Sequence, residues 1–508
     1  MKAIASTLLT SNNTNSKALL VVLLISALLL AVLSGIFSAF GNVILLIPLL
    51  ALFGVFFVLA APVSWTVWII FLAAFLVTGP SAYFIRFSQL QWLTVFVSAA
   101  LLLPALLYLI RIQIGAQPTQ FLRHFFWPGI FLLFVTFSTL INDPQFGDVV
   151  NGSRHYFLMW PLMLVFMLGL VRQDMQVQLW KALMIVAILQ LPMAIYQYFF
   201  VALKSMRFSP WDSVIGTFPG NIEGGGESAG MAFMLLIAML TAIALWREGK
   251  LSSTWMALVV FAGLGTLLLA EVKAIVMLLP FAIGLYYRRE LMKKPMESIL
   301  VMLGTLLLAG AIFMAYEKIH YGNISTSTFN TNQAASTYDR VMSALNPETV
   351  SLGGNELGRV THIVNWWAIN IKSGDLQHSL FGYGMGATFA SRFGVGELVG
   401  RFPYTIAGSS TIILLWEVGI LGHLAFLFVL LSGARASGRA AKNETIPEMH
   451  RIFLRVGAVG LLILTITLPY TSFHLYANPI QFLMMFMLGQ AAYWSCFVKS
   501  PKQFSDKK

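Results

Sequence analysis

The sequence has very few charged residues for its length. Only 10% of its 508 residues are Asp, Glu, Lys or Arg, whereas 58% are hydrophobic. A typical soluble domain carries about 25% charged residues. A chain of this composition cannot cover its surface with polar side chains, which excludes an ordinary soluble globular protein. Lipid is therefore the expected solvent for most of the chain.

Cysteine and metal-binding motifs are also scarce. The single cysteine, Cys496, has no partner within the chain, which excludes an internal disulfide framework. No Cys/His spacing typical of a metal site occurs, and there is no Asp-x-Asp pair of the kind expected for a metal-bound nucleotide sugar. We therefore expect neither a metal nor a cofactor.

The net charge of +12 has two possible meanings. Nucleic-acid binding would require a basic domain with base-stacking aromatic residues, and the sequence contains none. Basic loops at an anionic cytoplasmic membrane face explain the charge better. The expected partners are therefore membrane lipids and not nucleic acid.

Long apolar runs recur along the chain. Because about 20 mostly apolar residues cross a bilayer, they predict an all-α polytopic membrane protein with about fourteen transmembrane helices and at least twelve. The expected spans are residues 18–38, 42–62, 64–79, 91–110, 125–141, 157–171, 178–201, 228–246, 253–270, 273–287, 298–316, 410–432, 453–470 and 477–497.

Lysine and arginine predict the orientation of these spans. If the N-terminus is cytoplasmic, most of the 32 Lys and Arg residues fall in the inside loops and tails. This bias agrees with the rule that cytoplasmic loops are rich in Lys and Arg. We therefore expect a multi-pass membrane protein with both termini in the cytoplasm.

One connection is far longer than the others and defines the domain organisation. Residues 317–409 are predicted to form a large extracytoplasmic loop, between helices 1 to 11 in residues 1–316 and helices 12 to 14 with a cytoplasmic tail in residues 410–508. Long loops with their own pattern are usually functional. This loop is the first place to search for a site.

The loop contains helical patterns of its own. One apolar face repeats with the spacing of a helix at Val360, Ile363, Val364, Trp367 and Ile371. Together with Trp366, this pattern predicts an amphipathic helix that lies flat at the membrane interface. A second, shorter helix is expected at 338–345.

A glycine-rich stretch follows, "SLFGYGMGATFASRFGVGELVGR" from Ser379 to Arg401. Gly382, Gly384 and Ala387 have the spacing of a dinucleotide-binding fingerprint, G-x-G-x-x-A. That fingerprint should follow a strand and begin a helix, but this stretch follows an interfacial helix in a membrane protein. The glycines instead indicate a tight turn or a close approach of the backbone to a ligand.

Several cations fall on the outer side, against the inside bias. Each one alone is best explained by a headgroup contact or an ion pair. Together with the glycine-rich loop "KSMRFSPWDSVIGTFPGNIEGGGESAG", residues 204–230, they predict a cationic, glycine-lined cavity for an anion such as pyrophosphate. The outward cations are Arg86, Arg154, Lys204, Arg207, Lys273, Lys318, Arg340, Arg359, Lys372, Arg392 and Arg401.

Four motifs occur in an order that resembles a known family. They are "GTF" followed by a glycine-rich turn, the Arg359 to Trp366 segment, "SLFGYGMGATF", and "GSSTIILLWEVGILG". Over roughly residues 205–435 the chain resembles the O-antigen ligase and O-antigen polymerase superfamily of bacterial envelope proteins. This resemblance implies a metal-independent glycosyltransferase in the bacterial cytoplasmic membrane. Its donor would be an oligosaccharide linked to undecaprenyl pyrophosphate at the outer face.

The resemblance also implies roles for individual residues. Arg207, Lys273 and Arg359 match positions that hold the donor pyrophosphate, and we add Glu397 as the first candidate for the general base. Other candidate bases are Glu227, Glu271, Asp375, His378 and His474. The residues predicted to bind substrate are Arg340, Arg392, Arg401, Gly382, Gly384 and Ser409.

One departure from the family pattern separates the possible functions. Ligases carry a His-Asn-type pair eleven and ten residues before the glycine that corresponds to Gly419, where this chain has Gly408 and Ser409. The missing histidine favours a polymerase of surface polysaccharide or exopolysaccharide over a ligase. A flippase for lipid-linked sugars is a third possibility, but the chain shows no internal repeat. The family also suggests chain-length regulators and other assembly proteins as partners.

Overall fold

The computed structural model describes residues 61–113, 119–205, 210–270, 272–294, 357–391 and 394–497, with a few single residues between 296 and 314. In this part of the chain the secondary structure is helical, and the only extended pairs are two isolated bridges. The predicted all-α fold is confirmed for these residues. The expected span at 18–38, nearly all of 42–62, most of 298–316 and the expected helix at 338–345 lie outside the described residues.

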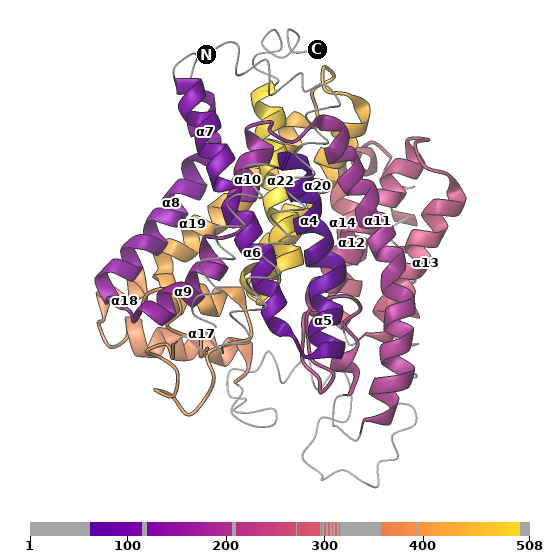
Figure 1. Ribbon diagram of the computed structural model, residues 1–508. Coiled ribbons are helices and arrows are strands. Elements are labelled where there is room, and N and C mark those ends of the chain that lie inside the picture. The colour runs from indigo at the N-terminus through magenta and orange to yellow at the C-terminus, as the bar shows by residue number, and fades with distance from the viewer. Residues whose placement is uncertain are drawn as a thin grey trace, which may run out of the picture.

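The helices form a bundle in which most run between two ends of the molecule (Figure 1). In its first half they are α4 (Val63–Leu72), α5 (Thr78–Ile85), α6 (Gln91–Ala100), α7 (Leu102–Gln113), α8 (Thr119–Asn142), α9 (Phe146–Tyr156), α10 (Trp160–Met167) and α11 (Gln173–Tyr196). In its second half they are α12 (Ser228–Arg247), α13 (Ser253–Leu269), α14 (Lys273–Lys293), α17 (Arg359–Trp366), α18 (Leu376–Phe381), α19 (Ser410–Ala440), α20 (Glu448–Thr467), α21 (Phe473–Tyr476) and α22 (Asn478–Phe497).

Seven helical stretches of the described residues are long and apolar enough to cross a membrane. Helices α13, α14 and α22 coincide with three further predicted spans, although they are not among the seven. The chain therefore has the character of a multi-pass membrane protein. The seven stretches are Val63–Ile85, Ser88–Ile110, Arg123–Asn142, Gln173–Lys204, Ser228–Arg247, Ser410–Ala440 and Glu448–Thr467.

The expected span at 157–171 has a different structure. Its apolar run forms only the short helix α10, which begins at Trp160 with Pro161 in its first turn and ends near Gly169, where the backbone has a φ of 69°. Every residue of α10 is buried. Apolar composition alone does not distinguish a short buried helix from a membrane span.

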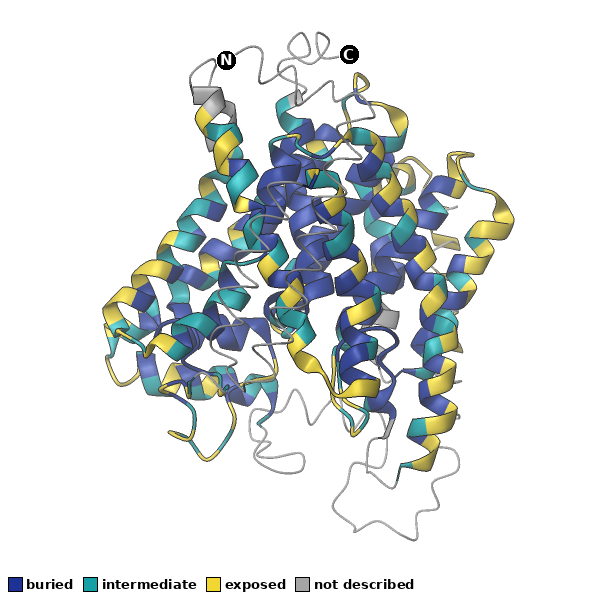
Figure 2. Cartoon of the chain, in the orientation of Figure 1, coloured by how far each residue is buried: buried dark blue, intermediate teal, exposed yellow. Residues whose placement is uncertain are grey.

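Helices α12 and α22 lie in the core of the bundle. Both are apolar around most of their circumference, and nearly all their side chains are buried, as Figure 2 shows for the centre of the molecule. A helix that is hydrophobic all round must be covered on every side. Helix α22 packs against α10, α19 and α20, and α12 packs against α11, α13 and α20.

Helix α19 bends at Gly419, whose φ of 69° and ψ of −170° are not helical. A kink of this kind leaves carbonyls in the preceding turn without helical partners. The loop after α18 supplies donors for them: the Tyr383 N–H donates to Trp416 O at 2.8 Å, and the Gly384 N–H donates to Glu417 O at 3.0 Å. The glycine-rich stretch is thus tied to the kinked helix.

The predicted amphipathic helix is present as α17, continued by a short π-helix from Trp367 to Ile371. Val364 and Trp367 on its apolar face are exposed, as a lipid-facing side would be. Trp366, which we predicted to anchor at the membrane, is instead buried. Its Nε1 donates to Leu415 O at 3.1 Å, one of the carbonyls before the kink.

Candidate functional site

A cavity lies at the end of the bundle where α5, α9 and the loops before α12 and α22 meet. Its volume is about 550 Å³. We call it the loop-end cavity. It is lined by Ala82, Arg86, Ser88, Gln91, Arg154, His155, Pro219, Gly220, Asn221, Glu223, Gly225, Gly226, Glu227, Phe389 and Tyr476. The 204–230 loop thus meets Phe389 from the long loop at one cavity. Of the predicted outward cations, Arg86 and Arg154 line it, together with the two acidic residues Glu223 and Glu227.

Arg154, near the end of α9, is the central cation of this cavity. It is half-buried, its Nη2 donates to Gln91 Oε1, and its guanidinium carbon lies 5.4 Å from the centre of the Trp92 ring. Its Nε is buried and has no hydrogen-bond partner among the described residues. Burial lowers the pKa of Arg154, but a guanidinium stays protonated in proteins. Arg154 is therefore a fixed positive charge on the cavity wall with a buried, unpaired Nε–H group.

The positive charge of Arg154 influences the pKa of one carboxyl group in the cavity, that of Glu227. Glu227 lies on the cavity wall immediately before the first residue of α12. Burial raises the pKa of Glu227 to about 7, and Arg154 opposes this shift. Among the described residues no ion pair joins Glu227 to Arg154. The ion pair found at this cavity is between the exposed side chains of Arg86 and Glu223, at 3.0 Å. A carboxyl group that titrates near neutral pH is suited to proton transfer.

The backbone that carries Glu227 is shaped by glycine. The Asn221 N–H donates to Gly225 O at 3.0 Å, and the Glu227 N–H donates to Pro219 O at 2.9 Å. Gly225 has a φ of 81°, a left-handed conformation that glycine adopts without strain. This closed turn exposes backbone N–H and C=O groups along the cavity.

The preceding Gly-Thr-Phe motif anchors that turn in the core. The Gln197 Oε1 accepts from the Gly216 N–H at 2.7 Å, and the Gln190 Oε1 accepts from the Thr217 N–H at 2.7 Å. The Thr217 hydroxyl then donates to Phe75 O at 2.6 Å. Because all these groups are buried and paired, the motif fixes the loop that positions Glu227.

His155 and Tyr476 form one wall of the cavity. Their rings meet edge to face with centroids 4.4 Å apart, and Phe389 lies 5.8 Å from Tyr476. Burial and the Arg154 charge lower the pKa of His155 to about 3, so its imidazole is neutral. Its Nδ1 lies 3.0 Å from Leu475 O and must donate there. The buried Nε2 then carries a lone pair, with no partner among the described residues.

The structure places the other predicted catalytic residues in different settings. The Arg359 guanidinium carbon lies 4.3 Å from the centre of the Tyr470 ring, and Arg359 is not among the residues lining the loop-end cavity. Lys273 begins α14, but its side chain lies outside the described residues, as do Arg207, Arg340, Arg392 and Glu271. Their predicted roles remain predictions.

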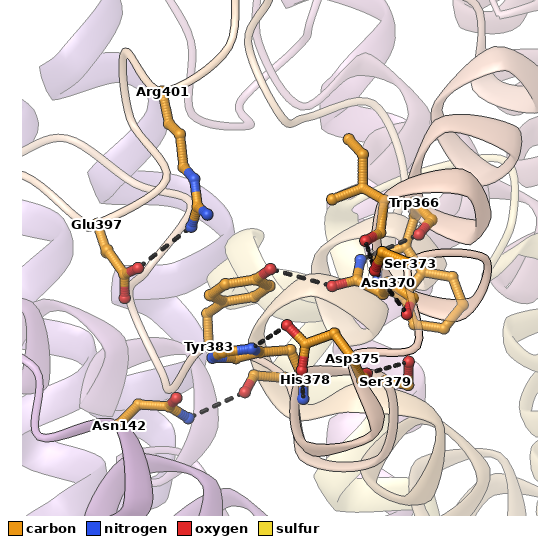
Figure 3. Close-up of polar contacts among 12 residues, drawn as sticks. Asn142, Trp366, Asn370, Ser373, Asp375, His378, Ser379, Tyr383, Glu397 and Arg401 are labelled. Atoms are coloured by element: carbon orange, nitrogen blue, oxygen red, sulfur yellow. Dashed lines mark hydrogen bonds and ion pairs between the residues drawn. The ribbon is translucent and has the colours of Figure 1, made fainter.

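Glu397 and Arg401 form an exposed ion pair of 3.3 Å, and Arg401 also lies over the Tyr383 ring (Figure 3). The His378 Nδ1 lies 2.6 Å from Asp375 Oδ2, and its ring stacks on Tyr383 with centroids 3.9 Å apart. These residues belong to the long loop and gather around Tyr383. They do not line the loop-end cavity.

Three residues predicted to bind substrate have structural partners. A Cβ on Gly382 would lie 2.4 Å from the Glu417 carbonyl carbon, so this glycine permits the close crossing of loop and α19. Gly384 donates to the same helix, as described above. Ser409 is fully buried and caps α19 by accepting from the Ile412 N–H at 3.3 Å. We predicted that these glycines permit either a tight turn or a close approach to a ligand. In the structure, Gly382 and Gly384 permit a close crossing of the loop backbone and α19.

The structure brings Arg154 and Glu227 to one cavity, a pairing that was not predicted. Arg154 was one of the outward cations, and Glu227 was one of several candidate bases, but nothing in the sequence paired them. Their shared cavity arises from the packing of α9 against the α21 region and of the glycine turn beside it.

Among the described residues, no group of three or more His, Cys, Asp or Glu side chains is placed to hold a metal ion. The charges of the loop-end cavity come instead from two arginines and two glutamates. Such a site presents both guanidinium and carboxyl groups to a ligand. No protein-family model matches the chain, and no curated protein matches it.

Proposed function

We propose that the protein is a membrane glycosyltransferase that joins oligosaccharide repeat units carried on undecaprenyl pyrophosphate, at the outer face of the bacterial cytoplasmic membrane. The reaction would extend a surface polysaccharide or exopolysaccharide. The observation that carries this proposal is the loop-end cavity, which is lined by a half-buried arginine and by a carboxyl group with a pKa of about 7 that are not joined by an ion pair.

Arg154 suits the leaving group of such a reaction. When the bond between the anomeric carbon and the pyrophosphate breaks, the bonding electrons go to the pyrophosphate, and its negative charge grows. A fixed guanidinium at that position stabilises the charge, by about 2.7–4 kcal/mol if it acts as one donor of an oxyanion hole does. The unpartnered Nε of Arg154 is the group we assign to this contact.

Glu227 suits the acceptor. A hydroxyl at the non-reducing end of the second repeat unit attacks the anomeric carbon as its proton passes to the Glu227 carboxylate. A new glycosidic bond forms, the growing chain leaves its lipid carrier, and the lipid pyrophosphate is released. A base is most effective when its pKa lies near the working pH, which the pKa of about 7 satisfies.

The aromatic wall suits the sugar. Tyr476 and Phe389 present ring faces and edges on which a pyranose can pack, and the neutral His155 offers its Nε2 as an acceptor for a sugar hydroxyl. In this proposal Arg359 remains a predicted donor-binding residue. It contacts Tyr470, at the start of the segment that ends with Tyr476.

The proposal is tested in the host by deleting the gene and complementing with wild type, Arg154→Gln and Glu227→Gln. Matched controls are Arg172→Gln, whose arginine forms an exposed 3.3 Å ion pair with Asp174, and Glu444→Gln, whose glutamate is exposed. Membrane levels of each variant are measured together with the surface glycan and the lipid-linked pool. We expect single repeat units to accumulate in the deletion strain and both site variants, and long chains to return with the controls.

Two other results would contradict the proposed polymerase function and indicate a different one. Long chains that form on the lipid carrier but are not transferred would indicate a ligase. Repeat units that accumulate only at the inner face would indicate a transporter.

A further inference from the structure

A second charged cavity lies at the other end of the bundle. Helix α19 begins at the loop end and continues for 31 residues, or about 46 Å at the helical rise. Its last turns, the second half of α14 and the first half of α20 enclose a cavity of about 960 Å³, which we call the basic cavity. Six of the basic side chains that line it are Arg288, Lys293, Arg435, Arg439, Arg451 and Arg455.

The positive charge of the basic cavity is poorly balanced. Glu290 is its acidic lining residue, and Arg247 already forms an ion pair with it. Arg455 lies 3.8 Å from Glu248. Within the described part of the chain, no carboxylate lies within ion-pair distance of Arg435, Arg439 or Arg451. Like charges held together in this way are unfavourable unless an anion joins them.

Three buried polar groups at the basic cavity also lack partners. The Arg451 Nε and the hydroxyls of Tyr286 and Tyr287 have no hydrogen-bond partner among the described residues. Tyr286 is only 8% exposed and lines the cavity. A buried donor without a partner costs free energy, so these groups indicate a missing acceptor.

The inner part of the basic cavity is apolar. Small residues on α19, Ala434 and Gly438, lie opposite Ala458 on α20, and Leu462 lies deeper on the same helix. Leu462 is eleven residues beyond Arg451, which corresponds to about 16 Å along the helix. The cavity therefore leads from a charged rim to an apolar interior, the shape that an amphiphile with an anionic head requires.

We infer that the basic cavity binds the phosphate group of an anionic membrane lipid. Arg435, Arg439 and Arg451 would contact the phosphate oxygens through charge-assisted hydrogen bonds, with the Tyr286 hydroxyl as a further donor. The acyl chains would lie along Ala458 and Leu462. This inference is independent of the proposed reaction, because the two cavities share no residue.

Native mass spectrometry of the full-length protein, released from nanodiscs of phosphatidylglycerol and phosphatidylcholine mixed equally, tests the inference. We expect wild type to retain phosphatidylglycerol about ten-fold more than phosphatidylcholine, and Arg435→Gln with Arg451→Gln to lose this preference. The control Arg172→Gln removes an exposed arginine that does not line the basic cavity, and it should behave as wild type. Equal retention of the two lipids by wild type, or an unchanged preference in the double variant, would overturn the inference.

Two further arms separate the alternatives. Arg435→Lys with Arg451→Lys keeps the charge but loses the paired guanidinium donors, so we expect it to retain only part of the lipid preference; a preference equal to that of wild type would show that charge alone is recognised and would overturn the assigned arginine contacts. Inorganic phosphate at about 10 mM should not displace the lipid. Its displacement of the lipid would show a soluble-anion site and overturn the assignment to a lipid.

Discussion

Glu227 and Arg154 face the same cavity from different segments, yet no ion pair joins them. Burial raises the pKa of the glutamate to about 7, and the arginine holds it from rising further. The arrangement leaves a space between a cation and a titratable carboxyl group, each of which would be satisfied by a ligand.

The first prediction concerns the pH dependence of turnover. If Glu227 is the base, it must be ionised, so the rate should rise with pH and level off above about pH 7. Arg154→Gln removes the cation that favours the carboxylate and should lower the rate about 10²–10³-fold while moving the midpoint to higher pH. Rates of purified protein in nanodiscs between pH 5 and 9 measure both effects. A profile without a midpoint near 7 would argue against this base.

The second prediction concerns stability at the same residue. The folded pKa of Glu227, about 7, lies above its ordinary value of 4.5, so the folded state keeps a proton that the unfolded state has released. Stability therefore falls as pH rises through this window. Glu227→Gln should be more stable than wild type by about 2 kcal/mol at pH 8, after allowance for partial exposure, and nearly equal at pH 4.5.

Thermal melting in nanodiscs at the two pH values measures this difference. The control Glu444→Gln, at an exposed position, should show none. If Glu227→Gln melts below wild type at pH 8, the ionised carboxylate stabilises the folded state, and the prediction is wrong.

A third prediction concerns the backbone crossing at Gly382. Its φ of 72° and the 2.4 Å approach to the Glu417 carbonyl carbon leave no room for a Cβ. Gly382→Ala should destabilise the protein by about 3 kcal/mol or more. Gly374 has a φ of 81° but open space around it, so Gly374→Ala is a matched control that should cost only about 1–2 kcal/mol. Equal melting of the two variants would refute the crossing.

A fourth prediction concerns His474, which joins three helices. Its Nδ1 accepts from the Ser410 hydroxyl at 2.8 Å, and its Nε2 donates to Leu464 O at 2.9 Å. Burial lowers the pKa of His474 to about 3, below the ordinary 6.5, so the unfolded state alone takes up a proton as pH falls below 6.5. Wild-type stability should therefore decrease from about pH 6.5 towards pH 3.

His474→Gln should have a shallower acid dependence and be less stable by about 2–3 kcal/mol at pH 7, because it loses buried hydrogen bonds. Melting temperatures from pH 4 to 8 compare the two slopes. Parallel curves would mean that His474 is not the titrating group.

Much of the helical framework could be predicted from the sequence, because long apolar runs and the spacing of Val360 to Ile371 carry that information locally. The run at 157–171 could not be resolved, since its burial in the core depends on α22 packing against it. The hydropathy of a buried helix and that of a membrane span are the same.

The sequence pointed to the glycine-rich 204–230 loop of the candidate site but not to the set of residues that line its cavity. Outward arginines beside a glycine-rich turn indicated a cationic cavity, but which of them face it depends on the packing of α9, α12 and the segment before α22. Gly382 shows the same limit: a tight turn was one of two roles expected for it, whereas its close contact with Glu417 requires the kink at Gly419. Such long-range approaches leave no local pattern in the sequence.

The most direct test of the proposed function is polymerisation by the purified protein, reconstituted with an oligosaccharide repeat unit on undecaprenyl pyrophosphate. Product length is measured for wild type, Glu227→Gln and Glu444→Gln at pH 8. The account predicts long chains with wild type and Glu444→Gln, and a rate at least about 100-fold lower with a well-folded Glu227→Gln. Wild-type rates from Glu227→Gln, or no chain growth by the wild-type protein, would contradict it.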